Sequence, residues 1–141
     1  MIALTRRYAF PAAHALRHPA FSEEENRRVY GKCANPGGHG HDYGVEVTVT
    51  GPVNERAGRL IDPALLDEIF EENIRSRFSH RLLNDDPIFR ERVPTAENLA
   101  EVIYAGLAEP VAERSTARVV GVRVVETHRN AFAYGDYGEP G

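Results

Sequence analysis

The sequence predicts an α+β fold, in which a four-stranded antiparallel sheet carries two helices on one face in the order β-β-α-α-β-β. Four stretches alternate apolar and polar side chains with the period of two that is typical of half-buried strands. Two longer stretches, between the second and third of these, repeat apolar residues at helical spacing. We therefore expect two strands, then two helices, then two more strands.

The first two strands are expected on either side of a glycine-rich loop. Residues 2–10 form the first strand, with apolar side chains at even positions: Ile2, Leu4, Tyr8 and Phe10. The second strand begins at Tyr43 and ends near Gly51, with apolar side chains at odd positions: Val45, Val47 and Val49. Ser22 and Glu25 form a capping box that predicts a short helix between the strands. Residues 31–40 are rich in glycine and form a loop.

The two main helices have recognisable start signals. Asp62-Pro63 caps the first helix, which is expected to run to about His80. Thr95 caps the second, and Pro110 is expected to end it. Residues 118–127 then alternate as a third strand with Val120, Val122 and Val124 on one face, and residues 132–134 belong to the last strand.

Composition excludes several functional classes. A length of 141 residues fits one domain over residues 1–141, and 42% hydrophobic with 27% charged residues is typical of a folded globular protein. With a net charge of −4, the chain lacks the excess of basic side chains that nucleic-acid binding requires. The apolar stretches are too short to span a membrane and no leader opens the chain, so we expect a cytoplasmic protein. Cys33 is the only cysteine, so no intrachain disulfide is possible.

Three histidines are the candidate metal ligands. His39 and His41 share the parity of Tyr43, so in an extended chain both side chains lie at the end of the buried face. His14 shares the parity of the first strand's apolar residues, so the three imidazoles could converge. Three protein ligands and one open position are typical of catalytic zinc, whereas structural zinc is usually rich in thiolate. The alternatives are unconnected surface histidines, or His18 in place of His14.

Other side chains are candidates for chemistry, each with a simpler explanation. Cys33 lies six residues before His39, where a nearby cation would favour its thiolate, unless it is an inert buried thiol. Glu126 continues the apolar parity of the third strand, so its carboxylate either binds a ligand's N–H donors or lies at a solvated strand end. The simpler explanation for His80 is a favourable interaction with the dipole at the C-terminal end of the helix, and for Thr95 it is helix capping.

Together these motifs resemble the family of 6-pyruvoyl-tetrahydropterin synthases and 6-carboxytetrahydropterin synthases over nearly the whole chain. The segments that carry the resemblance are Phe10-Pro-Ala-Ala-His14, Ser22-Glu-Glu-Glu-Asn26, Gly31-Lys-Cys33-Ala-Asn-Pro-Gly-Gly-His39-Gly-His41-Asp-Tyr43, Thr95-Ala-Glu-Asn98 and Val125-Glu126-Thr127. The resemblance implies the tunnelling fold, and a homohexamer of two trimers with sites between subunits.

The same resemblance implies a role for each site residue. It makes His14, His39 and His41 the zinc ligands, Cys33 the proton-abstracting residue, His80 its catalytic partner, Glu126 the anchor of the pterin ring, and Thr95 a neighbour of the pterin. The implied substrate is 7,8-dihydroneopterin triphosphate, which would lose triphosphate while zinc acts as a Lewis acid.

The chain also departs from the family pattern. Ser79 stands where the family usually has an aspartate before the catalytic histidine, and Asp85 or Asp86 could replace it. A zinc- and pterin-binding protein without efficient turnover is therefore the alternative function. The five residues between Cys33 and His39 favour a pyruvoyl product slightly over the carboxy product of the bacterial queuosine pathway.

Overall fold

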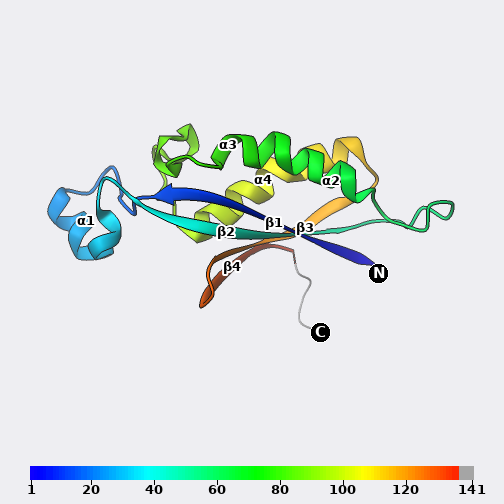
Figure 1. Cartoon of the computed structure of the whole chain (residues 1–141), viewed down its shortest axis with the longest axis horizontal. Helices are drawn as coiled ribbons and strands as arrows, with labels where there is room; N and C mark the ends of the chain where they lie inside the picture. The colour runs from blue at the N-terminus through cyan, green and yellow to red at the C-terminus, as the bar shows by residue number, and fades with distance from the viewer. Residues whose placement is uncertain (137–141) are drawn as a thin grey trace.

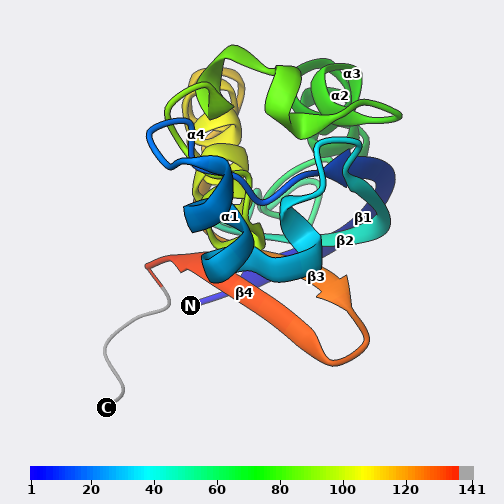
Figure 2. The same cartoon turned by 90° about the vertical axis from the view of Figure 1, so that its left-hand side faces the viewer.

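In the computed structural model, which describes residues 1–136, four antiparallel strands form one sheet in the order β1-β2-β3-β4. The main elements are β1 (Ala3–His14), α1 (Glu23–Tyr30), β2 (His39–Thr50), α2 (Pro63–Phe70), α3 (Ser76–Phe78), α4 (Ala96–Arg114), β3 (Arg118–Thr127) and β4 (Asn130–Gly135). Helices α2 and α4 cover one face of the sheet, and α1 lies beyond one end of it (Figures 1 and 2). The predicted α+β fold is confirmed.

The first two strands are longer than the sequence predicted. They pair from Ala3 with Thr50 to His14 with His39, so β1 continues through Pro11 and β2 begins four residues before Tyr43. Proline is tolerated because β1 is an edge strand. The Pro11 carbonyl accepts a hydrogen bond from the His80 amide (2.7 Å) on the side away from β2, and the missing N–H lies on that same side.

The first helical segment contains a wide turn. Helix α2 begins after Asp62, whose side chain accepts a hydrogen bond from the Ala64 amide, and it is followed by a π-helical turn, Glu71–Arg75, before α3. An α-helix would rotate Phe78 by about 80° relative to Phe70, because eight residues exceed two turns of 3.6 residues. The wider turn helps to keep both rings in the core, where each is at most 1% exposed.

The prediction that Pro110 ends the second long helix was wrong. Helix α4 continues through Pro110 to Arg114. Proline removes one backbone hydrogen bond, but the packing of Leu107 and Val111 against the sheet holds the last turns, since both side chains are fully buried.

A bulge in β3 also corrects one detail of the predicted alternation. Val119 pairs with Val49 and Gly121 with Thr48, so Val120 is an extra residue that leaves the buried face. The alternation holds after the bulge, where Val122 and Val124 are fully buried. A second register shift, between Val125 and Thr127 in the pairing with β4, lies at Glu126 itself.

Two smaller expectations concern α1 and the membrane. The Ser22 hydroxyl accepts a hydrogen bond from the Glu25 amide (3.1 Å), which is the predicted cap at the start of α1. No helix within residues 1–136 combines the length and apolar character needed to cross a membrane.

Candidate metal centre

Strand pairing brings the three predicted histidines together. His14 pairs with His39 and Ala12 with His41 in the β1–β2 ladder, so all three imidazoles lie on the helix-covered face of the sheet. Each offers one nitrogen, and these nitrogens lie within 4.8 Å of one another. Within residues 1–136 this is the one group of three or more potential ligand side chains so arranged.

The spacing of the ring nitrogens is compatible with a shared metal ion. His14 Nε2 lies 3.1 Å from His39 Nε2. Two nitrogens bound to one tetrahedral zinc at about 2.0–2.1 Å are separated by about 3.3 Å. The pair is therefore close to the separation of two ligands of one ion.

Contacts from a distant part of the chain orient the His14 ring. Its Nδ1 lies 2.7 Å from the Pro94 carbonyl oxygen and 3.1 Å from the Tyr43 hydroxyl. A carbonyl oxygen only accepts hydrogen bonds, so Nδ1 carries the proton and Nε2 presents a lone pair to the other histidines. A second-shell carbonyl of this kind is a usual partner of a metal-bound histidine.

The sequence analysis did not identify the residues that hold this carbonyl in place. Pro94 lies just before α4, where the Thr95 hydroxyl accepts a hydrogen bond from the Asn98 amide (3.2 Å). The Asn98 side chain donates to the Val93 carbonyl (2.8 Å) and so ties the loop to the helix. Nothing local in the sequence indicates these roles, apart from the spacing of Thr95 and Asn98.

Asn84 supports His14 from the other side. Its carboxamide oxygen accepts a hydrogen bond from the Ala15 amide, and its nitrogen donates to the Ala15 carbonyl, each at 2.8 Å. The backbone next to His14 is therefore held by two hydrogen bonds from a residue 69 positions away.

Burial favours the neutral forms of His14 and His41. It lowers the pKa of His14 to about 4, with the neighbouring His39 and His41 rings acting in the same direction and the Pro94 hydrogen bond opposing them. Burial also lowers the pKa of His41, against the attraction of the Glu126 carboxylate. Neutral imidazoles are the form that binds a metal.

One unsatisfied atom supports the fit of a metal to these residues. Among the buried side-chain nitrogen and oxygen atoms of the described residues, only His41 Nε2 lacks a hydrogen-bond partner. An orphaned buried acceptor or donor is costly in a folded protein. A cation bound between the three rings would satisfy it, and three neutral nitrogens are a suitable donor set for zinc.

Glu126 lies beside the histidines. It belongs to β3, two residues beyond the buried Val124, and its side chain is only 18% exposed. Its Oε2 atom is 3.9 Å from His14 Nε2, and its charge contributes, after burial, to the raised pKa of Tyr43. The carboxylate therefore faces the cluster, which favours a ligand-binding position over a solvated strand end.

Cys33 lies near the cluster in the chain but is not part of it. It belongs to a short 3-10 turn, Gly31–Ala34, and is partly buried. Its carbonyl accepts a hydrogen bond from the Leu16 amide (2.7 Å), which ties the turn to the segment after His14. The structure brings the backbone of Cys33 toward the site, while the ligand group consists of histidines alone.

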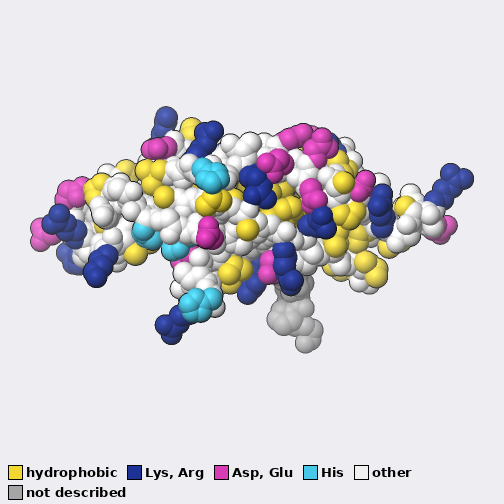
Figure 3. Space-filling model, in the orientation of Figure 1, with side chains coloured by type: hydrophobic (Ala, Val, Ile, Leu, Met, Phe, Trp, Pro, Cys, Tyr) yellow, Lys and Arg dark blue, Asp and Glu magenta, His cyan; other side chains and the backbone are white. Residues whose placement is uncertain are grey.

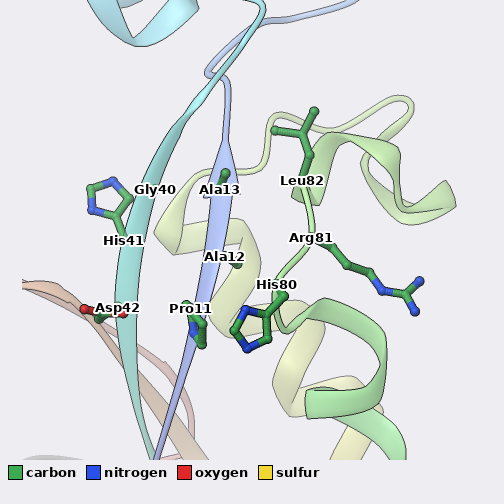
Figure 4. A pocket seen from close by; sticks show the side chains of 9 residues that line it. All are labelled: Pro11, Ala12, Ala13, Gly40, His41, Asp42, His80, Arg81 and Leu82. Carbon is green, nitrogen blue, oxygen red and sulfur yellow. The ribbon is translucent and has the colours of Figure 1, made fainter.

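His80 is placed apart from the metal cluster. It is exposed and has a φ of 61°, the one positive φ among the described residues other than glycine. It shares a cavity of about 450 Å³ with His41, but in Figure 4 the two rings lie on opposite sides of β1 and do not face each other. One copy of the chain therefore does not bring His80 to the three-histidine cluster.

The nearby candidates for the missing aspartate are constrained differently. Asp86 forms a two-bond ion pair with Arg77, at 2.7 Å for each bond, so its carboxylate is already engaged. Asp85 is exposed.

His18, the alternative metal ligand, stacks on Phe21 with 4.7 Å between ring centroids and does not belong to the three-histidine cluster.

Comparison with known proteins identifies the family. A family model described as 6-pyruvoyl tetrahydropterin synthase matches residues 3–136. The chain belongs to this family. The predicted resemblance is confirmed, and membership in the 6-pyruvoyl tetrahydropterin synthase family supports a pterin synthase function.

Individual relatives match over most of their length. The 6-pyruvoyl tetrahydrobiopterin synthase of Poecilia reticulata is 39% identical over 93% of this chain and 88% of that protein. The Homo sapiens protein of the same name is 37% identical over 93% of this chain and 89% of its own. The solved structure of 6-pyruvoyl tetrahydropterin synthase from Caenorhabditis elegans aligns with a TM-score of 0.87 at 32% identity, covering 98% of this chain and 96% of that one.

Proposed function

We propose that this chain is a zinc-dependent pterin synthase that converts 7,8-dihydroneopterin triphosphate, with loss of triphosphate, into 6-pyruvoyl-tetrahydropterin. The observation that carries the proposal is the convergence of His14, His39 and His41, with His41 Nε2 buried and unpaired, beside the carboxylate of Glu126. In this family, such a site combines a metal with an anchor for the pterin.

The three histidines would hold the zinc through their neutral rings. Bound there, zinc would supply Lewis-acid polarisation of oxygen atoms on the substrate's side chain. The Glu126 carboxylate would accept hydrogen bonds from paired N–H groups of the pterin ring, which matches its acceptor-only chemistry. Thr95, which the family resemblance places near the pterin, caps α4 next to Pro94 and would also help to hold His14.

The proton transfers are assigned to Cys33 and His80. The Cys33 thiolate would take a carbon-bound proton from the side chain, and His80 would exchange protons with the side-chain oxygens. The carbon–oxygen bond to the triphosphate breaks in the same sequence, and its electron pair leaves with the triphosphate. The dihydropterin ring gains the electrons that the side-chain carbons lose, so no external reductant is required.

The placement of His80 outside the three-histidine group favours a site shared between subunits. We propose the homohexamer of two trimers that the resemblance implies. Strands β1 and β4 are the two edges of the sheet, and because residues 80–82 bond to β1 only near Pro11 and Ala13, β4 and the first part of β1 offer edges to another copy. Mixing His80→Ala protein with His39→Ala protein tests this arrangement. Activity should return in the mixed oligomer if a site combines both subunits, and should stay absent if each subunit has a complete site.

The pyruvoyl product is favoured over the carboxy product. Relatives named as 6-pyruvoyl tetrahydrobiopterin synthases align over 93% of the chain, whereas the putative 6-carboxy-5,6,7,8-tetrahydropterin synthase of Archaeoglobus fulgidus, at 34% identity, aligns over 64% of it. The five residues between Cys33 and His39 point the same way.

The decisive experiment is to incubate the zinc-loaded protein with 7,8-dihydroneopterin triphosphate and to measure both the pterin products and the released triphosphate. Cys33→Ala should abolish turnover while zinc stays bound, because the thiol is not a ligand. An unimpaired Cys33→Ala protein would contradict the assigned role.

A second function remains in competition because Ser79 replaces the family aspartate. A serine cannot stabilise a protonated His80 by charge, and Asp86 is already paired with Arg77. The chain would then bind zinc and pterin without efficient turnover. Tight pterin binding with no product in the same incubation would establish that alternative.

The cytoplasmic location stays a prediction. The single domain over residues 1–141 also stays a prediction, and residues 137–141 lie outside the described part of the chain.

A further inference from the structure

A second cavity lies between α1 and the turn that carries Cys33. Its volume is about 430 Å³. Its charged and amide lining side chains are Arg17, Glu23, Arg27, Lys32 and Asn35. Three cations against one carboxylate make the lining positive, although the chain as a whole has a net charge of −4. Figure 3 shows basic side chains gathered, with acidic ones among them, at the end of the molecule that α1 forms.

The cations of this cavity fall into two kinds. Arg17 is held in place, because Nη1 donates to the Ala34 carbonyl (2.7 Å) and Nη2 pairs with Glu23. Arg27 and Lys32 are exposed, and their side chains have no hydrogen-bond or ion-pair partner within residues 1–136. The cavity therefore has one preorganised guanidinium and two cations without a protein partner.

The cavity adjoins the proposed active site through short stretches of chain. Arg17 follows His14 by three residues, which span at most about 11 Å. Lys32 and Ala34 flank Cys33 on either side, and the Leu16–Cys33 backbone hydrogen bond joins the two segments. The cavity is therefore lined by the two residues next to Cys33 in the chain.

We propose that this cavity binds the phosphate chain of the substrate, with Arg17, Arg27 and Lys32 contacting its oxygens. The inference rests on the proposed function, in which an oligophosphate leaves. When the carbon–oxygen bond breaks, the leaving oxygen gains negative charge, and fixed cations beside it lower the energy of that state. Guanidinium groups suit phosphate because their N–H donors form paired hydrogen bonds.

Glu23 has a specific part in this arrangement. Its carboxylate pairs with the Arg17 guanidinium. Phosphate oxygens would compete for the same donors and displace Glu23, whose side chain is 67% exposed and can turn to solvent. Removing the Glu23 charge should therefore strengthen anion binding, whereas removing the cations should weaken it.

Calorimetric titration of the zinc-loaded full chain with inorganic tripolyphosphate tests the proposal. Arg27→Ala and Lys32→Ala should each raise the dissociation constant about tenfold, which corresponds to one lost charge-assisted contact. Glu23→Gln should lower it several-fold. The matched control is Arg56→Ala in the loop between β2 and α2, at the opposite end of the molecule from α1, which should bind as the unmodified protein does (Figure 1). Zinc content is measured after each titration, because tripolyphosphate itself binds metal ions.

Two outcomes of these experiments distinguish failure of the phosphate site from failure of the proposed function. Unchanged tripolyphosphate affinity in both Arg27→Ala and Lys32→Ala, with circular dichroism showing folded protein, would overturn the phosphate site while pterin turnover could still stand. Affinity that depends on Arg27 and Lys32 in a protein without pterin turnover would support the site and refute the proposed function. Restored affinity in Arg27→Lys would support a contact made by charge.

Discussion

Acidification of the metal-free protein should reveal the burial of neutral His14. The side chain is 1% exposed, and its pKa falls from 6.5 to about 4 on folding. The unfolded chain therefore binds more protons than the folded one between pH 6.5 and pH 4, so stability increases with pH in this window. The contribution is complete above pH 6.5 and is lost as the pH falls to about 4.

The magnitude follows from the two pKa values. Between pH 7 and pH 5 the His14 equilibrium should remove about 2 kcal/mol from the free energy of unfolding, and below pH 4 about 3 kcal/mol in total. Urea denaturation at pH 7, 6 and 5 measures this change. His14→Gln should lose about 2 kcal/mol less than the unmodified protein over the same range, because it has no imidazole to protonate.

The matched control is His128→Gln, because His128 is exposed in the turn between β3 and β4. That variant should retain the pH dependence of the unmodified protein. Added zinc, which binds only the folded state with neutral rings, should move the acid loss to lower pH. If His14→Gln and the unmodified protein lose stability equally on acidification, the account of a buried neutral His14 is wrong.

Three other changes test the surroundings of the site and the core. Asn84→Ala removes both hydrogen bonds to Ala15, so it should weaken zinc binding about tenfold in a chelator competition. The control Asn73→Ala removes one hydrogen bond within a helix and should leave the zinc affinity unchanged. Equal zinc affinities in the two variants would refute the positioning role of Asn84. Pro110→Ala should raise the unfolding free energy by about 1–3 kcal/mol in urea, since it restores a helix hydrogen bond, and a lower stability would show that the ring packs favourably. Ile74→Ala should lower the unfolding free energy by about 2–5 kcal/mol because the side chain is fully buried. A loss below about 1 kcal/mol would mean that the π-helical turn collapses into the space left by the deleted side-chain atoms.

The strand pattern anticipated much of the candidate site. The shared parity of His39, His41 and Tyr43 held because β2 is already extended at His39. Glu126 followed from the same argument on β3, since Val122 and Val124 are buried after the first bulge, although the β3–β4 register shifts again at Glu126 itself. Side-chain direction along a strand depends on local geometry, and local geometry is what a sequence pattern reports.

Predictions at prolines were less successful. The first strand was expected to end at Phe10, just before Pro11, and Pro110 was expected to end a helix, yet both prolines lie inside their elements. Each outcome depends on partners that are distant in the sequence. Pro11 is tolerated because its nitrogen faces the outer edge of the sheet, and Pro110 because the surrounding helix is packed on the core.

The sequence by itself determined the order of strands and helices, the face on which each site histidine lies, and the family. Only the tertiary structure decided which nitrogen of His14 faces the cluster, because the Pro94 carbonyl that selects it is 80 residues away. It also separated His80 from the histidines in one copy of the chain, since that position depends on how the segment after α3 meets the edge of β1. Local periodicity specifies directions along one element, whereas distances between elements depend on how the whole core packs.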